Sequence, residues 1–211
     1  DFIVRDSGAK IMVCMPRYEN VFAPLLKDGV LKQVVLTDVG DYASPVYNVL
    51  IKLESMIHHV PAGPAMGPGL YRFSDMMAQG PGAAPKTQAA PGDLAMIQYT
   101  GGTTGNPKGV MLTHANLVAN TLQCRALLHD VKSGPGGDIF LGVTPFFHVY
   151  GMTVVMNLAI SAGCTLVLLP RFMVDRVAAA VKKYKCTVFP GVELMYNTLN
   201  QSPKSAQGYL S

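Results

Sequence analysis

The segment Tyr99–Val110 holds the residues of this chain that are best suited to bind a charged ligand. It reads Tyr-Thr-Gly-Gly-Thr-Thr-Gly-Asn-Pro-Lys-Gly-Val. Glycines let the backbone approach a ligand closely and leave amide N–H groups unshielded. The threonine hydroxyls add donors, and the lysine adds a positive charge. Because such an arrangement suits a polyphosphate, we expect a phosphate-binding loop with these contact residues: Thr100, Gly101, Gly102, Thr103, Thr104, Gly105 and Lys108.

Two other glycine-rich phosphate loops do not fit this segment. A Walker A loop needs glycine before its lysine and Ser or Thr after it, but Pro107 precedes Lys108 and Gly109 follows. A dinucleotide-binding fingerprint opens a helix, whereas Thr100 takes the place of its first glycine and a strand is expected next. A hairpin turn that binds no ligand is the remaining alternative. It would explain only some of these residues and not the order of all twelve.

The ordered string resembles the signature loop of the adenylate-forming superfamily, which includes acyl-CoA synthetases, peptide-synthetase adenylation domains and luciferases. Gly101 departs from the family pattern, in which most members have serine, and Leu112-Thr-His-Ala-Asn-Leu117 follows. Both features are similar to the bacterial long-chain fatty acyl-CoA ligases. The segments Leu169–Phe172 and Val188–Val192 are also similar to family segments, although Glu193 stands where the family usually has proline.

A second block, Pro145–Gly151, reads Pro-Phe-Phe-His-Val-Tyr-Gly. From the residues alone, its histidine is best interpreted as a satisfied core residue. The resemblance instead implies that the block borders an acyl pocket and shapes it, without proton transfer. The substrate-pocket residues that it implies are Phe147, His148, Tyr150 and Gly151.

The resemblance also implies a two-step reaction with small-molecule substrates. A carboxylate, with a fatty acid as the leading class, attacks ATP to give an acyl-adenylate, and the thiol of CoA then displaces AMP. Lys108 and the loop amides would hold the β- and γ-phosphates, and Mg²⁺ would bridge phosphate oxygens. No residue of this chain is assigned a catalytic role, and the CoA site is expected outside it.

Several further parts of such an enzyme are expected beyond Ser211: the adenine-binding segment, the ribose-binding aspartate, the hinge and a mobile C-terminal domain. We therefore expect part of a large N-terminal domain, with one subdomain over about 1–143 and a second beginning at about 144–211. The isolated chain is expected to be inactive. Two alternatives stay open: a stand-alone nucleotide- or phosphate-binding module, or part of an aryl-CoA ligase or amino-acid adenylation domain.

Composition narrows the class of protein further. Hydrophobic residues make up 49% and charged residues 14%, which is typical of a globular protein. The net charge of +4 is scattered without interleaved aromatics, so nucleic-acid binding is not expected. The four cysteines show neither zinc-ligand nor disulfide spacing, which favours reduced thiols in the cytoplasm. Membrane contact is expected to be peripheral at most. The uncharged stretch 139–170 is expected to form strand, helix and strand rather than a membrane span. The oligomeric state is left open.

Short apolar runs alternate with amphipathic segments, which predicts an α/β fold with a largely parallel sheet flanked by helices. The expected helices run from Ser44 toward His58, over Ala115–His129 and from Val174, and two earlier ones end at Gly8 and Gly29. The Gly/Pro-rich excursion 61–92 is expected to lack regular structure except at Ser74–Gln79. The expected strands are Ile11–Met15, Gln33–Thr37, Leu94–Tyr99, Gly109–Leu112, Ile139–Val143, Cys164–Leu169 and Cys186–Phe189.

Overall fold

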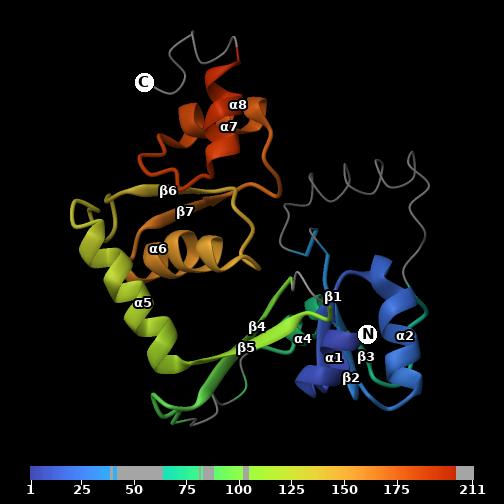
Figure 1. Cartoon of the computed structure of the whole chain (residues 1–211). Coiled ribbons are helices and arrows are strands. Elements are labelled where there is room, and N and C mark those ends of the chain that lie inside the picture. Colours follow the sequence, from blue (N-terminus) through green and yellow to red (C-terminus); the bar gives the residue numbers. More distant parts are fainter. Residues whose placement is uncertain (39, 42–63, 81, 83–87, 102–104, 203–211) are drawn as a thin grey trace. The chain divides into compact units, whose positions relative to one another are not determined.

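The computed structural model describes residues 1–38, 40–41, 64–80, 82, 88–101 and 105–202. They form two compact units (Figure 1). The first comprises Asp1–Gln88 and Tyr99–Val110, and the second comprises Ala89–Gln98 and Met111–Ser211. The helix expected from Ser44 toward His58 lies outside the described residues. The subdomain boundary expected at about residue 143 stays a prediction.

The first unit is built on a parallel sheet with the strand order β1-β2-β3. The central strand β2 pairs on both sides, with Val34 opposite both Met12 of β1 and Leu70 of β3. The core of this unit is a cluster of buried apolar side chains. It combines residues of β1 and β2, such as Val34, with Phe22 and Leu25 of the amphipathic helix α2. The elements are α1 (Phe2–Ser7), β1 (Ile11–Cys14), the 3₁₀ turn η1 (Pro16–Tyr18), α2 (Glu19–Lys27), β2 (Gln33–Leu36), β3 (Leu70–Arg72) and α4 (Phe73–Ala78).

Strand β3 corrects the expectation for the Gly/Pro-rich excursion. The helix near Ser74–Gln79 is confirmed as α4, but the absence of other regular structure is wrong at Leu70–Arg72, which pairs in parallel with β2. The strand exists because of this pairing, not because of its own sequence. The stop signals at Gly8 and Gly29 are confirmed, with φ angles of 68° and 71° that favour glycine.

Strands β4 (Leu94–Thr100) and β5 (Lys108–Thr113) pair only with each other among the described residues, and their residues are divided between the two units. Both strands were expected, to within one residue at each end. Parallel neighbours need a connection of about a dozen residues or more, so the short link from Gly101 to Pro107 makes this pair a hairpin.

The second unit is built on strands β6 and β7, which run parallel, with Phe140 opposite Leu166. The expected strand Cys186–Phe189 is wrong as a full strand, because only Val188 bridges to Phe140 before Pro190 and Gly191 end the extended segment. The elements are α5 (His114–Leu127), β6 (Ile139–Gly142), the π-helix η2 (Gly151–Asn157), α6 (Leu158–Ser161), β7 (Thr165–Leu168), α7 (Val174–Tyr184) and α8 (Glu193–Asn200).

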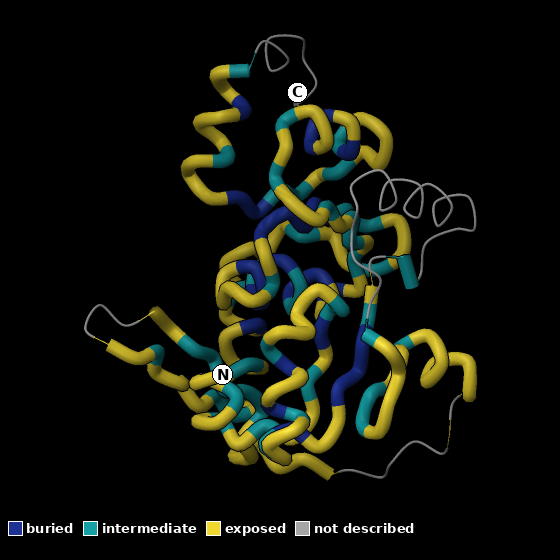
Figure 2. Tube along the Cα trace, turned by 90° about the vertical axis from the view of Figure 1, so that its right-hand side faces the viewer, coloured by how far each residue is buried: buried dark blue, intermediate teal, exposed yellow. Residues whose placement is uncertain are grey.

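Alternate residues of β6 pack on opposite faces of this small sheet. Phe140 joins the core cluster of Leu158 on α6, whereas Leu141 joins the cluster of Val177 on α7 and Leu199 on α8. In Figure 1, α6 lies below the β6–β7 pair and α7 and α8 lie above it. Helices therefore cover both faces, as parallel strands require, and the buried residues of the chain are marked dark blue along the trace in Figure 2.

The α/β fold with parallel strands flanked by helices is thus confirmed. The uncharged stretch 139–170 forms strand, helix and strand, and its helical part begins as a π-helix before it becomes α-helical. Within the described part of the chain, none of the helices has the length and apolar character needed to cross a membrane.

Candidate functional site

The predicted phosphate loop connects the last residue of β4, Thr100, to the first residue of β5, Lys108. Gly101 and Gly105 are exposed, and a Cβ atom added to either would meet no described atom within 4 Å. Gly105 has a φ angle of 150°, which side-chain-bearing residues rarely adopt. The described part of the loop therefore presents open backbone beside an exposed lysine. Gly102, Thr103 and Thr104 lie outside the described residues.

Tyr99 ties the start of this loop to helix α1. Its hydroxyl donates a hydrogen bond to the carboxylate of Asp6 at 2.5 Å. This bond, more than the partial burial of the ring, raises the pKa of Tyr99 above its usual value of 10.0. Asp6 was not predicted as a partner of Tyr99, because the two residues are 93 positions apart and no local pattern joins them.

The block Pro145–Gly151 forms a turn between β6 and η2. The backbone N–H of His148 donates to the carbonyl oxygen of Pro145 at 3.1 Å. The rings of Phe147 and His148 are tilted against each other, with centroids 4.6 Å apart, and Gln98 Nε2 donates to the carbonyl of Phe147 at 2.9 Å. His148 is exposed in this structure, so the interpretation of this histidine as a core residue is wrong.

Gly151 is buried where this turn enters the π-helix. A Cβ atom there would lie 2.4 Å from the carbonyl oxygen of Pro145, which is closer than real Cβ contacts. The glycine therefore allows the backbone of η2 to pack directly on the turn that carries His148 and Tyr150. Short π-helical segments are frequent at functional sites.

A largely apolar cleft of about 400 Å³ opens beside this turn. It is lined by Thr144, Pro145, His148, Val149, Tyr150, Val192 and Met195. Two of the four sequence-predicted pocket residues, His148 and Tyr150, line the cleft, whereas Phe147 and Gly151 do not. Burial, with a smaller effect of nearby Tyr196, raises the pKa of Tyr150.

Val192 and Met195 were not predicted for this site. Val192 is the last residue of the segment Val188–Val192, and Met195 lies in the first turn of α8. Dispersed methionines give no sequence signal of a pocket. Only the fold brings the two residues to the turn after β6.

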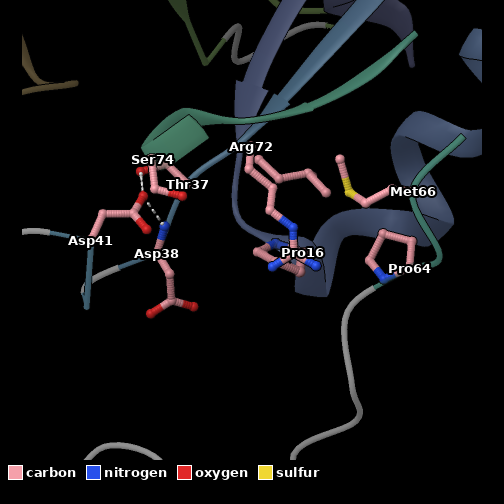
Figure 3. A pocket seen from close by; sticks show the side chains of 9 residues that line it. Pro16, Thr37, Asp38, Asp41, Pro64, Met66, Arg72 and Ser74 are labelled. Carbon is pink, nitrogen blue, oxygen red and sulfur yellow. Dashed lines mark hydrogen bonds between the residues drawn. The ribbon is translucent and has the colours of Figure 1, made fainter. Parts of the chain in front are cut away.

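A second hollow, of about 300 Å³, lies in the first unit beside the carboxyl ends of β2 and β3 (Figure 3). Its polar wall is organised around Asp41, whose carboxylate accepts hydrogen bonds from the Thr37 hydroxyl at 2.8 Å and the Asp38 N–H at 2.9 Å. Arg72 and Ser74 also line it, but none of the sequence-predicted site residues does.

No group of three or more His, Cys, Asp and Glu side chains is placed to hold a metal ion among the described residues. The four cysteines are free thiols, and burial raises the pKa of Cys14, Cys164 and Cys186.

A family model and the curated relatives of this chain point to the same family. The family model described as AMP-binding enzyme matches residues 1–210. The long-chain-fatty-acid–CoA ligase of Bacillus subtilis (strain 168) is 35% identical over 208 residues, which are 97% of this chain and 36% of the relative. The enzyme of the same name from Escherichia coli O6:H1 is 30% identical, with 93% of this chain and 35% of the relative covered.

Solved structures agree in fold. ATP-bound MatB from Rhodopseudomonas palustris superimposes with a TM-score of 0.65 at 25% identity, covering 99% of this chain and 35% of that chain. The anthranilate CoA ligase AuaEII in complex with anthranoyl-AMP also gives a TM-score of 0.65, but at 19% identity it shows the fold alone, with 89% and 32% of the two chains covered. This chain thus spans about a third of the length of these relatives. With its family match over residues 1–210, the chain belongs to the AMP-binding enzyme family.

Proposed function

We propose that this chain supplies the ATP phosphate-binding loop and part of the acyl pocket of an enzyme that activates a fatty acid to its CoA thioester. The observation that carries the proposal is the loop between β4 and β5, where exposed glycine backbone at Gly101 and Gly105 leads to the exposed Lys108. The curated relatives named long-chain-fatty-acid–CoA ligase support the substrate class.

In the proposed first step, the substrate carboxylate attacks the α-phosphorus of ATP. The bond from this phosphorus to the bridging oxygen breaks, and pyrophosphate leaves. This chain contributes positioning and charge neutralisation rather than a covalent group. Lys108 holds the β- and γ-phosphates together with backbone N–H groups of the loop, and the hydroxyl of Thr103 or Thr104 adds a neutral donor. In the second step, the CoA thiol displaces AMP from the acyl-adenylate.

Magnesium is expected with ATP, and it would neutralise charge that develops on the phosphates. In phosphate-transfer sites, Mg²⁺ commonly binds the substrate phosphates, water and one or two carboxylates. The described residues do not fit a metal centre of their own, so we assign no residue of this chain to Mg²⁺. The CoA site is likewise assigned to no residue here. We expect the protein in the cytoplasm, with at most peripheral membrane contact.

The test uses the full protein that contains this chain and measures ATP–pyrophosphate exchange that depends on an added acid. Fatty acids, aromatic acids and amino acids are compared at one ATP concentration. We expect fatty acids to support the fastest exchange. Exchange only with aromatic or amino acids would assign the protein to another branch of the family. ATP binding without exchange for any acid would instead support a phosphate-binding module.

A further inference from the structure

The apolar cleft of the second unit has a wall to which no role has been given. Val192 and Met195, here called the α8 wall, face the turn that carries His148 and Tyr150. We propose that the α8 wall selects the length of the alkyl chain that the cleft accepts, with Met195 as the specificity-determining residue and Tyr196 as the residue that positions it. This inference rests on the proposed function.

One hydroxyl group holds the segment that leads into the α8 wall. Tyr196 donates to the carbonyl oxygen of Phe189 at 2.7 Å and accepts from the backbone N–H of Gly191 at 2.8 Å. Its ring also meets the ring of Phe189 edge-on, with centroids 5.6 Å apart. The hydroxyl uses its donor and one acceptor site on backbone groups immediately before Val192. Tyr196 therefore fixes the path by which the chain enters α8.

A further hydrogen bond joins the two walls of the cleft. The hydroxyl of Thr144, which is buried, donates to the carbonyl oxygen of Pro190 at 3.0 Å. Thr144 directly precedes the turn on one side, and Pro190 lies two residues before Val192 on the other. Because the backbones on both sides are held in this way, the space left between the walls depends on the side chains of the α8 wall.

The chemistry of the lining favours an alkyl chain over a charged group. Thr144 already donates its proton to Pro190, and an unpaired charge in an apolar cleft is strongly unfavourable. Met195 is partly buried, packs on the core cluster that contains Leu141 and Leu199, and also lines the cleft with a flexible, apolar side chain. A volume of about 400 Å³ suits a small-molecule segment.

The experiment measures kcat/KM of the full protein for saturated straight-chain acids of increasing length. Each methylene excluded from an apolar site lowers kcat/KM about fourfold, which corresponds to about 0.8 kcal/mol. Met195→Phe adds bulk to this wall, so kcat/KM for the longest acids should fall relative to the shortest, by about fourfold for each methylene that the larger ring excludes. Met195→Ala should move the optimum toward longer acids, and Met195→Leu should keep the wild-type profile.

Three further variants separate an effect on chain-length specificity from a general loss of stability or activity. Leu194→Ala is the matched control, since Leu194 is the neighbouring residue, is 74% exposed and does not line the cleft. Tyr196→Phe keeps the ring but removes both backbone hydrogen bonds, so discrimination between acid lengths should weaken while KM for ATP is unchanged. Val192→Phe, at a residue that is 43% exposed, replaces Met195→Phe if the latter does not fold.

The outcomes distinguish the inference from the proposed function. A shifted length profile in the Met195 variants, with the Leu194→Ala profile unchanged, supports the α8 wall. An active wild-type protein whose length profile is the same in all folded Met195 and Val192 variants would overturn the inference alone. A wild-type protein without any acid-dependent exchange would overturn the proposed function and this inference together.

Discussion

A methyl group added at Gly151 would lie 2.4 Å from the carbonyl oxygen of Pro145. That oxygen belongs to the backbone and also accepts the N–H of His148, so it has no freedom to turn away. The start of the π-helix and the turn before it consequently pack backbone against backbone. The aromatic side chains of the cleft depend on this close approach.

Gly151→Ala should therefore destabilise the protein by about 1–3 kcal/mol, the usual range for overpacking a tight site. Denaturant unfolding of the variant and the wild type measures the difference. Gly101→Ala is the matched control, because a Cβ atom there meets no described atom within 4 Å, and its effect should stay within about 0.5 kcal/mol. Equal stability of the Gly151→Ala variant and the wild type would show that the close packing is wrong.

The carboxylate of Asp138 should make stability depend on acidity. The Thr187 hydroxyl at 2.6 Å, and then the N–H of Lys132 at 2.6 Å, stabilise the charged form and lower the pKa of Asp138 below 3.8. A lowered folded-state pKa gives stability that is present above 3.8 and is lost as pH falls through the folded-state value. The stability difference between wild type and Thr187→Val, measured by unfolding at successive pH values, should shrink over that acidic window. A difference that does not change with pH would contradict this account.

Helix α5 begins with reciprocal hydrogen bonds that can be tested separately. The Thr113 hydroxyl accepts from the Asn116 N–H at 3.2 Å, and the Asn116 side chain accepts from the Thr113 N–H at 2.9 Å. Removing such a cap typically destabilises a protein by about 1 kcal/mol. Thr113→Ala should lower the free energy of unfolding by that amount, while Thr113→Ser should keep the hydroxyl and most of the stability. Similar losses in both variants would point to the lost methyl group instead.

The positions of most strands and helices could be predicted because their signals are local. Gly8 and Gly29 end helices through their own backbone freedom, and the apolar runs of β1, β2, β4 and β6 are visible in the sequence. Strand β3 was missed because Leu70–Arg72 is short, only partly buried and ordered by its pairing with β2. The strand expected at Cys186–Phe189 is reduced to one bridge, from Val188 to Phe140, because Pro190 and Gly191 follow directly and end the extended segment.

The residues of the candidate site likewise differ in whether a local sequence pattern reveals them. His148 and Tyr150 stand in one recognisable block, so their place at the cleft could be predicted. Met195 could not, since its place at the cleft depends on tertiary contacts: the packing of α8 on the core, and the hydrogen bonds that Tyr196 and Thr144 make to Phe189 and Pro190. The π-helix was also missed, because a continuous apolar run does not reveal its helical period.

The 211-residue chain by itself should be inactive. It spans about a third of the length of the relatives it matches. Mixed with ATP, a fatty acid, CoA and Mg²⁺, the purified chain should release no pyrophosphate above background. The full protein, assayed in parallel, is the positive control. Sustained acyl-CoA formation by the isolated chain would contradict the proposal that further parts of the enzyme are required.

Lys108 provides the most direct test of the central claim, that the β4–β5 loop binds the phosphates of ATP. The measurement is acid-dependent ATP–pyrophosphate exchange by the full protein, with Lys27→Ala in the last turn of α2 as the matched exposed control. A charge-assisted hydrogen bond contributes about 1.5–3 kcal/mol, so Lys108→Ala should lower kcat/KM for ATP about 10- to 100-fold. The melting temperature without nucleotide should stay unchanged, because an exposed lysine supports no core. Normal exchange kinetics in Lys108→Ala, together with a clearly lower melting temperature, would show instead that Lys108 is a structural residue and that the loop is not the phosphate site.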